Sequence, residues 1–141
     1  MIEFLGLFIF ITGFIIGLGA VTVIDMHGFL GRNSPYWTEA TIRTHKVTKP
    51  LIWIGIFLTT VGGFVFYSQN PITWIPMVHL LILPILVVNG MFLSFYVSPR
   101  LLKMEVEGRS RETLPQRLQM HISVSFVISF VGWWGSVLLL V

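Results

Sequence analysis

The sequence predicts an all-α integral membrane protein, a four-helix bundle whose helices run alternately up and down. Three observations lead to this prediction. The 141 residues are 55% hydrophobic and only 11% charged, whereas soluble domains carry about 25% charged residues. The apolar residues gather into four stretches, each long enough to cross a bilayer, which takes about 20 residues of helix. The polar segments between these stretches are short, so consecutive helices are expected to be antiparallel neighbours.

The four helices are expected at about residues 2–24, 36–67, 72–98 and 115–141, and they form one transmembrane domain over residues 1–141. The first is not expected to be a cleaved signal peptide, because Glu3 and no Lys or Arg precedes its long apolar run. Before the second, Ser34 and Pro35 are a favourable cap and first helical residue. We expect Pro50 to kink this helix, and residues 68–71 to form the turn before the third.

The basic residues predict the orientation in the membrane. All nine Lys and Arg lie within residues 32–49 and 100–117, and an even number of helices separates these two segments. By the positive-inside rule both segments are cytoplasmic, and both termini are therefore extracytoplasmic. The expected location is a bacterial inner membrane. The lipid bilayer is the expected partner, joined by further copies of the chain or a larger membrane complex, and the net charge of +3 gives no reason to expect nucleic acid.

Small and polar residues mark one face of each predicted helix, and such faces allow close helix packing in lipid. They are Gly6, Gly13 and Gly17 in the first helix, Gly55, Thr59 and Gly63 in the second, Asn89, Gly90 and Ser94 in the third, and Ser125, Ser129, Gly132 and Ser136 in the fourth. We expect these faces to converge inside the bundle.

Histidines and carboxylates predict a polar pocket near the cytoplasmic side. Its expected members are Asp25, His27, Glu39, His45 and His121. The spacing of His121, Ser125 and Ser129 places them on one helical face, which directs the imidazole into the bundle. An ionisable side chain in that position is a candidate functional group. His79 lies near the outer end of the third helix, so the bilayer separates it from the other three histidines.

The first interpretation of this pocket is a b-type haem site. His45 and His121 are the first-choice axial ligands, with His27 as a further candidate. Arg43 and Lys49 are then expected to pair with the haem propionates. Because the chain has no cysteine, thiolate ligands and covalent haem attachment through cysteine are excluded.

A divalent metal ion is the second interpretation, and a site without any cofactor is the third. The candidate metal ligands are His45, His121, His27, Asp25 and Glu39. Their nitrogen and oxygen atoms suit zinc, iron or manganese. The same pocket also suits a proton or ion relay, a non-catalytic subunit with a docking surface, or a plain salt-bridged cluster.

Four short segments carry a family resemblance. They are Ile24-Asp25-Met26-His27, the basic stretch 43–52 that contains Pro50, His79-Leu80-Leu81, and Ser98-Pro99-Arg100. With the chain length and the four-helix plan, they resemble the small membrane proteins of the copper-resistance CopD and HemJ protoporphyrinogen-oxidase group. The resemblance implies haem-linked oxidation chemistry on a four-helix bundle. The expected function is therefore a membrane redox protein, acting as a porphyrinogen oxidase or in electron transfer. The alternative is a non-catalytic subunit, or a transporter of protons, ions or divalent metals.

Overall fold

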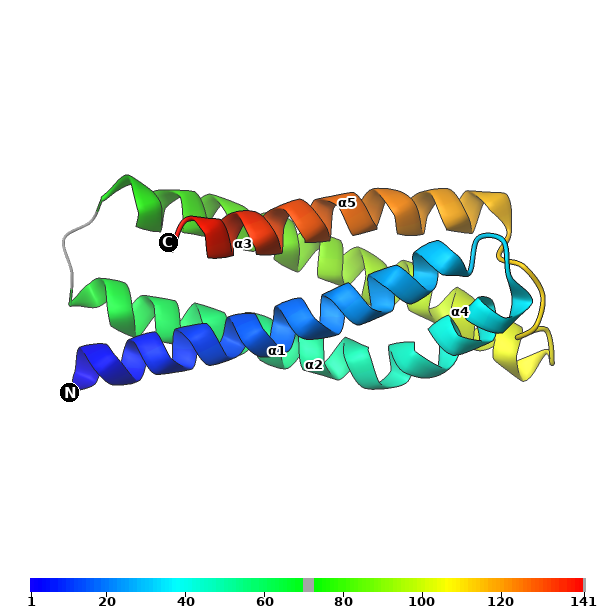
Figure 1. Cartoon of the computed structure of the whole chain (residues 1–141), viewed down its shortest axis with the longest axis horizontal. Coiled ribbons are helices and arrows are strands. Elements are labelled where there is room, and N and C mark those ends of the chain that lie inside the picture. The colour runs from blue at the N-terminus through cyan, green and yellow to red at the C-terminus, as the bar shows by residue number, and fades with distance from the viewer. Residues whose placement is uncertain (70–72, 141) are drawn as a thin grey trace.

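The protein is an all-helical bundle, as predicted. The computed structural model describes residues 1–69 and 73–140, and within these ranges four helical rods are long and apolar enough to cross a membrane. They are α1 (Ile2–Leu30), α2 (Pro35–Ser68), a third rod formed by α3 (Trp74–Phe92), the π-helix η1 (Leu93–Val97) and α4 (Ser98–Val106), and α5 (Gln116–Leu138). Figure 1 shows α1 and α3 running in one direction along the bundle and α2 and α5 in the other.

The helix bounds differ from the predicted ones mainly at the end of the bundle with loops 31–34 and 107–115, which we call the basic end. There α1 continues to Leu30, and the third rod continues to Val106. Pro99 does not end the third rod: it follows the π-helix directly, lies in the first turn of α4, and the rod continues beyond it to Val106. The turn predicted at 68–71 lies partly outside the described residues.

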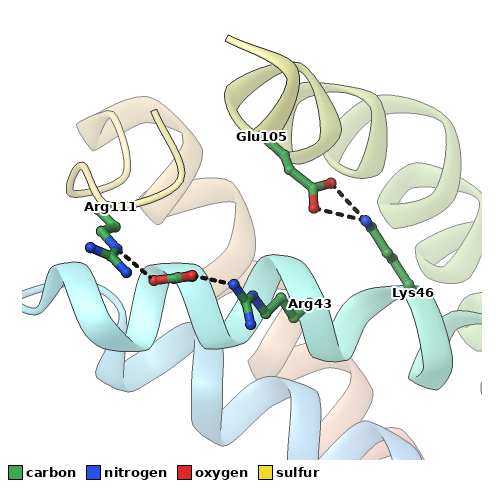
Figure 2. A network of polar contacts seen from close by, with 5 residues as sticks. Arg43, Lys46, Glu105 and Arg111 are labelled. Carbon is green, nitrogen blue, oxygen red and sulfur yellow. Dashed lines mark hydrogen bonds and ion pairs between the residues drawn. The ribbon is translucent and has the colours of Figure 1, made fainter. Parts of the chain in front are cut away.

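The second helix begins at Pro35 after Ser34, as predicted, and Pro50 lies inside it. The kink expected at Pro50 stays a prediction. At 1.5 Å per residue, α2 is about 51 Å long and the third rod about 50 Å, whereas the hydrocarbon core of a bilayer is about 30 Å thick. The polar parts of α2 and the third rod, by which they exceed this thickness, lie at the basic end. There Lys46 Nζ and Glu105 form an ion pair at 2.8 Å that joins α2 to α4 (Figure 2).

Glycines bring the backbones of α1 and α2 into contact. A Cβ atom at Gly55 would lie 2.5 Å from the Cα atom of Gly17, and Gly13 faces Thr59 across the same seam. Close packing of this kind replaces the hydrophobic driving force that helices in lipid lack. The predicted convergence of the small-residue faces of the first two helices is confirmed.

Polar side chains join α3 to α5. Asn89 Nδ2 donates to the Ser125 carbonyl oxygen at 3.1 Å and to Ser129 Oγ at 2.8 Å, and Ser125 Oγ donates to Asn89 Oδ1 at 2.8 Å. All three residues are buried. Since α5 packs on α1 and α3, and α2 packs on α1 and α3, α2 and α5 lie diagonally across the bundle.

The seam between α2 and α3 opens at the end opposite the basic end. An apolar cavity of about 470 Å³ lies there, and Phe14, His79 and Trp133 contribute to its walls. Phe64 and Leu80, which also line it, are mostly exposed. Exposed apolar side chains cover much of the described surface, as expected for helices that contact lipid.

Candidate functional site

A small polar cavity near the basic end lies between α1, α2 and the third rod. Its polar lining residues are Asp25, Thr41, His45, Lys49 and Ser94, and apolar residues complete the wall. Its volume of about 50 Å³ gives room for a few water molecules. We call it the polar cavity.

Asp25 and His45 face the polar cavity from neighbouring helices. Only 6% of Asp25 and 9% of His45 is exposed. Within the described part of the chain, neither Asp25 Oδ2 nor His45 Nε2 has a hydrogen-bond partner. A buried polar atom without a partner is costly, and an ionisable group inside a membrane bundle is rare without a functional reason. These two side chains are therefore the core of the candidate site.

The π-helix shapes the third wall of the polar cavity. Ser98 N–H donates to the Leu93 carbonyl oxygen, one residue further back than in an α-helix. In this register the donor for the Ser94 carbonyl would be residue 99, and Pro99 has no N–H. The Ser94 carbonyl is thus left open to a donor from another helix. Single π-helical turns of this kind are frequent at functional sites.

Lys49 supplies that donor. Its Nζ atom donates to the Ser94 carbonyl oxygen at 3.3 Å, and Trp53 Nε1 donates to Ser94 Oγ at 3.0 Å. Both donors come from α2, so they fix the distance between α2 and the π-helix. Lys49 forms no ion pair with a carboxylate among the described residues. Its ammonium group therefore adds a positive charge without an ion-pair partner to the lining that it shares with Asp25 and His45.

The structure does not bring together the five side chains predicted to share one pocket, and this is a correction. Asp25 and His45 line the polar cavity, but His27 does not. His27 Nδ1 lies 3.1 Å from Thr44 Oγ1, and its ring packs against Trp37. The reason is helical geometry: residues two apart on a helix point about 200° from one another, so Asp25 and His27 face different neighbours.

Glu39 and Arg43 belong to an ion-pair network on the surface of the basic end. Glu39 Oε1 accepts from Arg43 Nη2 at 2.6 Å, and Glu39 Oε2 accepts from Arg111 Nε at 3.0 Å (Figure 2). His45 lies six positions after Glu39, which turns their side chains about 240° apart on α2. Neither Glu39 nor Arg43 lines the polar cavity, whereas Lys49 does.

His121 lies in a different pocket, between α5 and the third rod. Its ring packs edge-on against Phe92 and Tyr96, and this pocket has a volume of about 450 Å³. His45 and His121 do not meet because they lie on α2 and α5, the diagonal pair of the bundle. The sequence indicates a similar depth in the membrane for His45 and His121, and this similarity led to the prediction that they share one pocket.

These positions decide how well the expected cofactors fit. Within residues 1–69 and 73–140, no three His, Asp or Glu side chains are grouped so that they could hold a metal ion. The polar cavity is far smaller than a porphyrin, and His121 lies outside it, so this arrangement does not fit a haem between His45 and His121. Haem and metal binding stay predictions, which the Soret absorption and the metal content of the purified protein test.

His79 lies at the opposite end, away from the other three histidines, as predicted. Its Nε2 atom donates to the Ser136 carbonyl oxygen at 2.9 Å, which leaves Nδ1 as an acceptor. The Tyr67 hydroxyl donates to that atom at 2.8 Å. The three residues tie α2, α3 and α5 together on the wall of the apolar cavity. Both nitrogens of this imidazole are thereby satisfied.

Comparison with protein families, curated proteins and solved structures gives no match to this chain. The class of protein is defined by its own features, an all-helical bundle of membrane-spanning length with a buried carboxylate and a buried imidazole on one cavity. The resemblance to the CopD and HemJ group stays a prediction.

Proposed function

We propose that this chain is a proton-relay membrane protein in which Asp25 and His45 accept and pass on a proton inside the bundle. One observation carries the proposal: Asp25 Oδ2 and His45 Nε2 are buried, lack partners among the described residues and line the same cavity. Carboxylate and imidazole groups are common carriers of protons in proteins. Chains of such groups inside membrane bundles serve as proton relays in pumps and transporters.

The polar cavity favours a proton over a metal or alkali cation. The Lys49 ammonium group lies on the same cavity and would repel a second cation at short range. A proton needs no set of ligands, only an acceptor and a path. Because the cavity has room for a few water molecules, water can connect Asp25 Oδ2 with His45 Nε2.

The polar interior has a defined extent along the bundle. From Ser94 it continues to Asn89, which lies about 7.5 Å along the third rod toward the opposite end. Asn89 is buried and forms hydrogen bonds to α5. Beyond Asn89, the buried side chains of Phe14, Leu86 and Trp133 form an apolar layer. In the described arrangement the relay is therefore interrupted toward the opposite end, and transfer through the apolar layer requires the helices to move.

The test is proton flux through liposomes that contain the purified full chain. A potassium diffusion potential drives proton uptake, and a pH-sensitive dye inside the liposomes reports it. We expect Asp25→Asn and His45→Gln to slow uptake by roughly 100-fold each, because each replacement removes a proton-transfer group at similar size.

His27→Gln is the matched control, because it removes an imidazole near the same depth that lies outside the polar cavity. We expect its proton flux to equal that of the unmodified protein. Equal flux in liposomes with and without the protein would overturn the proposal, as would full activity of Asp25→Asn.

A further inference from the structure

The pocket that holds His121 carries a large excess of positive charge. It lies at the basic end between the third rod and the beginning of α5, and we call it the basic pocket. Four of the nine cationic residues line it, Arg100, Lys103, Arg109 and Arg117, and Glu107 is the single carboxylate among its lining residues.

Ion pairs neutralise only part of this charge. Arg109 pairs with Glu107 at 3.2 Å and with Glu112 at 2.8 Å, and these contacts raise the pKa of the Arg109 guanidinium. Lys103 approaches the same Glu107 at 3.7 Å. Arg100 and Arg117 have no carboxylate partner among the described residues.

The basic pocket is ordered by an aromatic side chain. The Arg100 guanidinium lies 3.5 Å above the centre of the Tyr96 ring and also donates to the Tyr96 carbonyl oxygen. The His121 ring meets the edge of Tyr96 with 5.2 Å between ring centres. No hydrogen-bond partner for the His121 nitrogens is found in the described part of the chain, so they are open to a ligand.

An apolar surface adjoins the basic pocket on the membrane side. Arg117 and His121 are four residues apart on α5, as are Met120 and Val124, so the two pairs lie side by side on one side of this helix. Met120 and Val124 are mostly exposed, as is Phe95 on the neighbouring π-helix. A ligand that matches both parts has an anionic head and a hydrocarbon body.

We infer that the basic pocket binds the phosphate headgroup of an anionic membrane lipid. Guanidinium groups pair with phosphate through two parallel hydrogen bonds, and basic pockets between helices at the membrane surface bind phosphate headgroups. Arg100 and Arg117 hold the phosphate, His121 donates or accepts a further hydrogen bond, and the acyl chains lie along Met120 and Val124. This inference does not depend on the proposed proton relay, which uses other residues.

The experiment measures binding of fluorescent phosphatidylglycerol to the full chain in phosphatidylcholine nanodiscs. We expect the double variant R100Q/R117Q to bind about 30-fold more weakly, since each arginine removed takes away charge-assisted hydrogen bonds to the phosphate, at about fivefold in affinity for each arginine. R100K/R117K keeps the charge but loses the paired guanidinium hydrogen bonds, so it is expected to bind more tightly than R100Q/R117Q and more weakly than the unmodified protein. Gel filtration and thermal unfolding check that each variant remains folded.

R43Q/R111Q is the matched control, because it removes two arginines from the same end without touching the basic pocket. Its affinity should change by roughly twofold at most at physiological salt. Equal weakening in both double variants would overturn the inference, because it would show general attraction between the basic end and the bilayer. If inorganic phosphate fully displaced the fluorescent phosphatidylglycerol, the inference that the bound phosphate group belongs to a lipid would be overturned.

Discussion

At the scale of single residues, Asn89 shows how a polar side chain stabilises a bundle that lipid surrounds. Its amide donates two hydrogen bonds to α5 and accepts one, and all partners are buried. The sequence predicted that Asn89, Ser125 and Ser129 would face the interior, because helical spacing places small polar residues on one face. Helical spacing alone is sufficient for this prediction, since the facing sides of the third and fourth predicted helices each contain several small polar residues.

Asn89→Leu keeps the approximate side-chain volume and removes these hydrogen bonds. We expect it to lower the free energy of unfolding by about 1–2 kcal/mol, the range for hydrogen bonds between membrane helices and for buried polar groups that lose a partner. Val88→Leu, at a neighbouring residue that is 65% exposed, is the control and should change stability by roughly 0.5 kcal/mol at most. Unfolding in mixed detergent micelles gives both values.

At the scale of helices, the contact between α1 and α2 depends on glycines, because the two backbones lie so close that no side chain fits between them. Alanine at Gly55 would place its Cβ against the backbone of Gly17, and the backbone cannot move away without separating the helices. Gly19, also on α1, has no atom within 4 Å of the corresponding position. Replacement of glycine by alanine is therefore expected to change the stability of the protein in opposite directions at Gly55 and Gly19.

We expect Gly55→Ala to destabilise the protein by roughly 1–3 kcal/mol through overpacking. Gly19→Ala should stabilise it by about 0.5–1 kcal/mol, because alanine loses less backbone entropy in a helix. Thermal unfolding of both variants in the same detergent shows whether each is less or more stable than the unmodified protein. Destabilisation of similar size in both variants would mean that the seam is not the tight contact described.

The sequence predicted the existence and order of the helices better than their ends. An apolar stretch identifies only the part of a helix that lies in lipid, so the extensions to Leu30 and Val106 were missed. The ion pair of Lys46 with Glu105 joins the extension of the third rod to α2 at the basic end. The π-helix was missed as well, because the third helix was expected to end at residue 98. The rod instead continues past Pro99, and the Ser98 N–H bonds one residue further back than in an α-helix.

The candidate site was only partly predictable for a related reason. Sequence position gives the depth of a side chain in the bundle, and this was sufficient to select Asp25 and His45. It does not give the rotation of each helix or the choice of neighbours. His27 therefore faces Thr44 and Trp37, and His121 faces the basic pocket. A plot of helical rotation would have separated Asp25 from His27.

At the scale of the whole molecule, the orientation in the membrane is open to a direct test. Both loops of the basic end lie together in Figure 1, at the end away from the start of α1 and the end of α5. By the positive-inside rule, a reporter inserted after Glu107 should be cytoplasmic, and one fused after Val141 should be extracytoplasmic. A cytoplasmic reporter at the C-terminus would reverse the orientation and place the polar cavity near the outer surface.

The apolar cavity between α2 and α3 also makes the two sides of α2 unequal in compressibility. Hydrostatic pressure favours the arrangement of smaller volume, and the side of α2 that faces α3 borders the apolar cavity of about 470 Å³. The α1–α2 seam has no volume to lose, because its glycines are already in contact. Moderate pressure should therefore move α2 and α3 together around His79 and Trp133 first, and leave the packing between α1 and α2 unchanged.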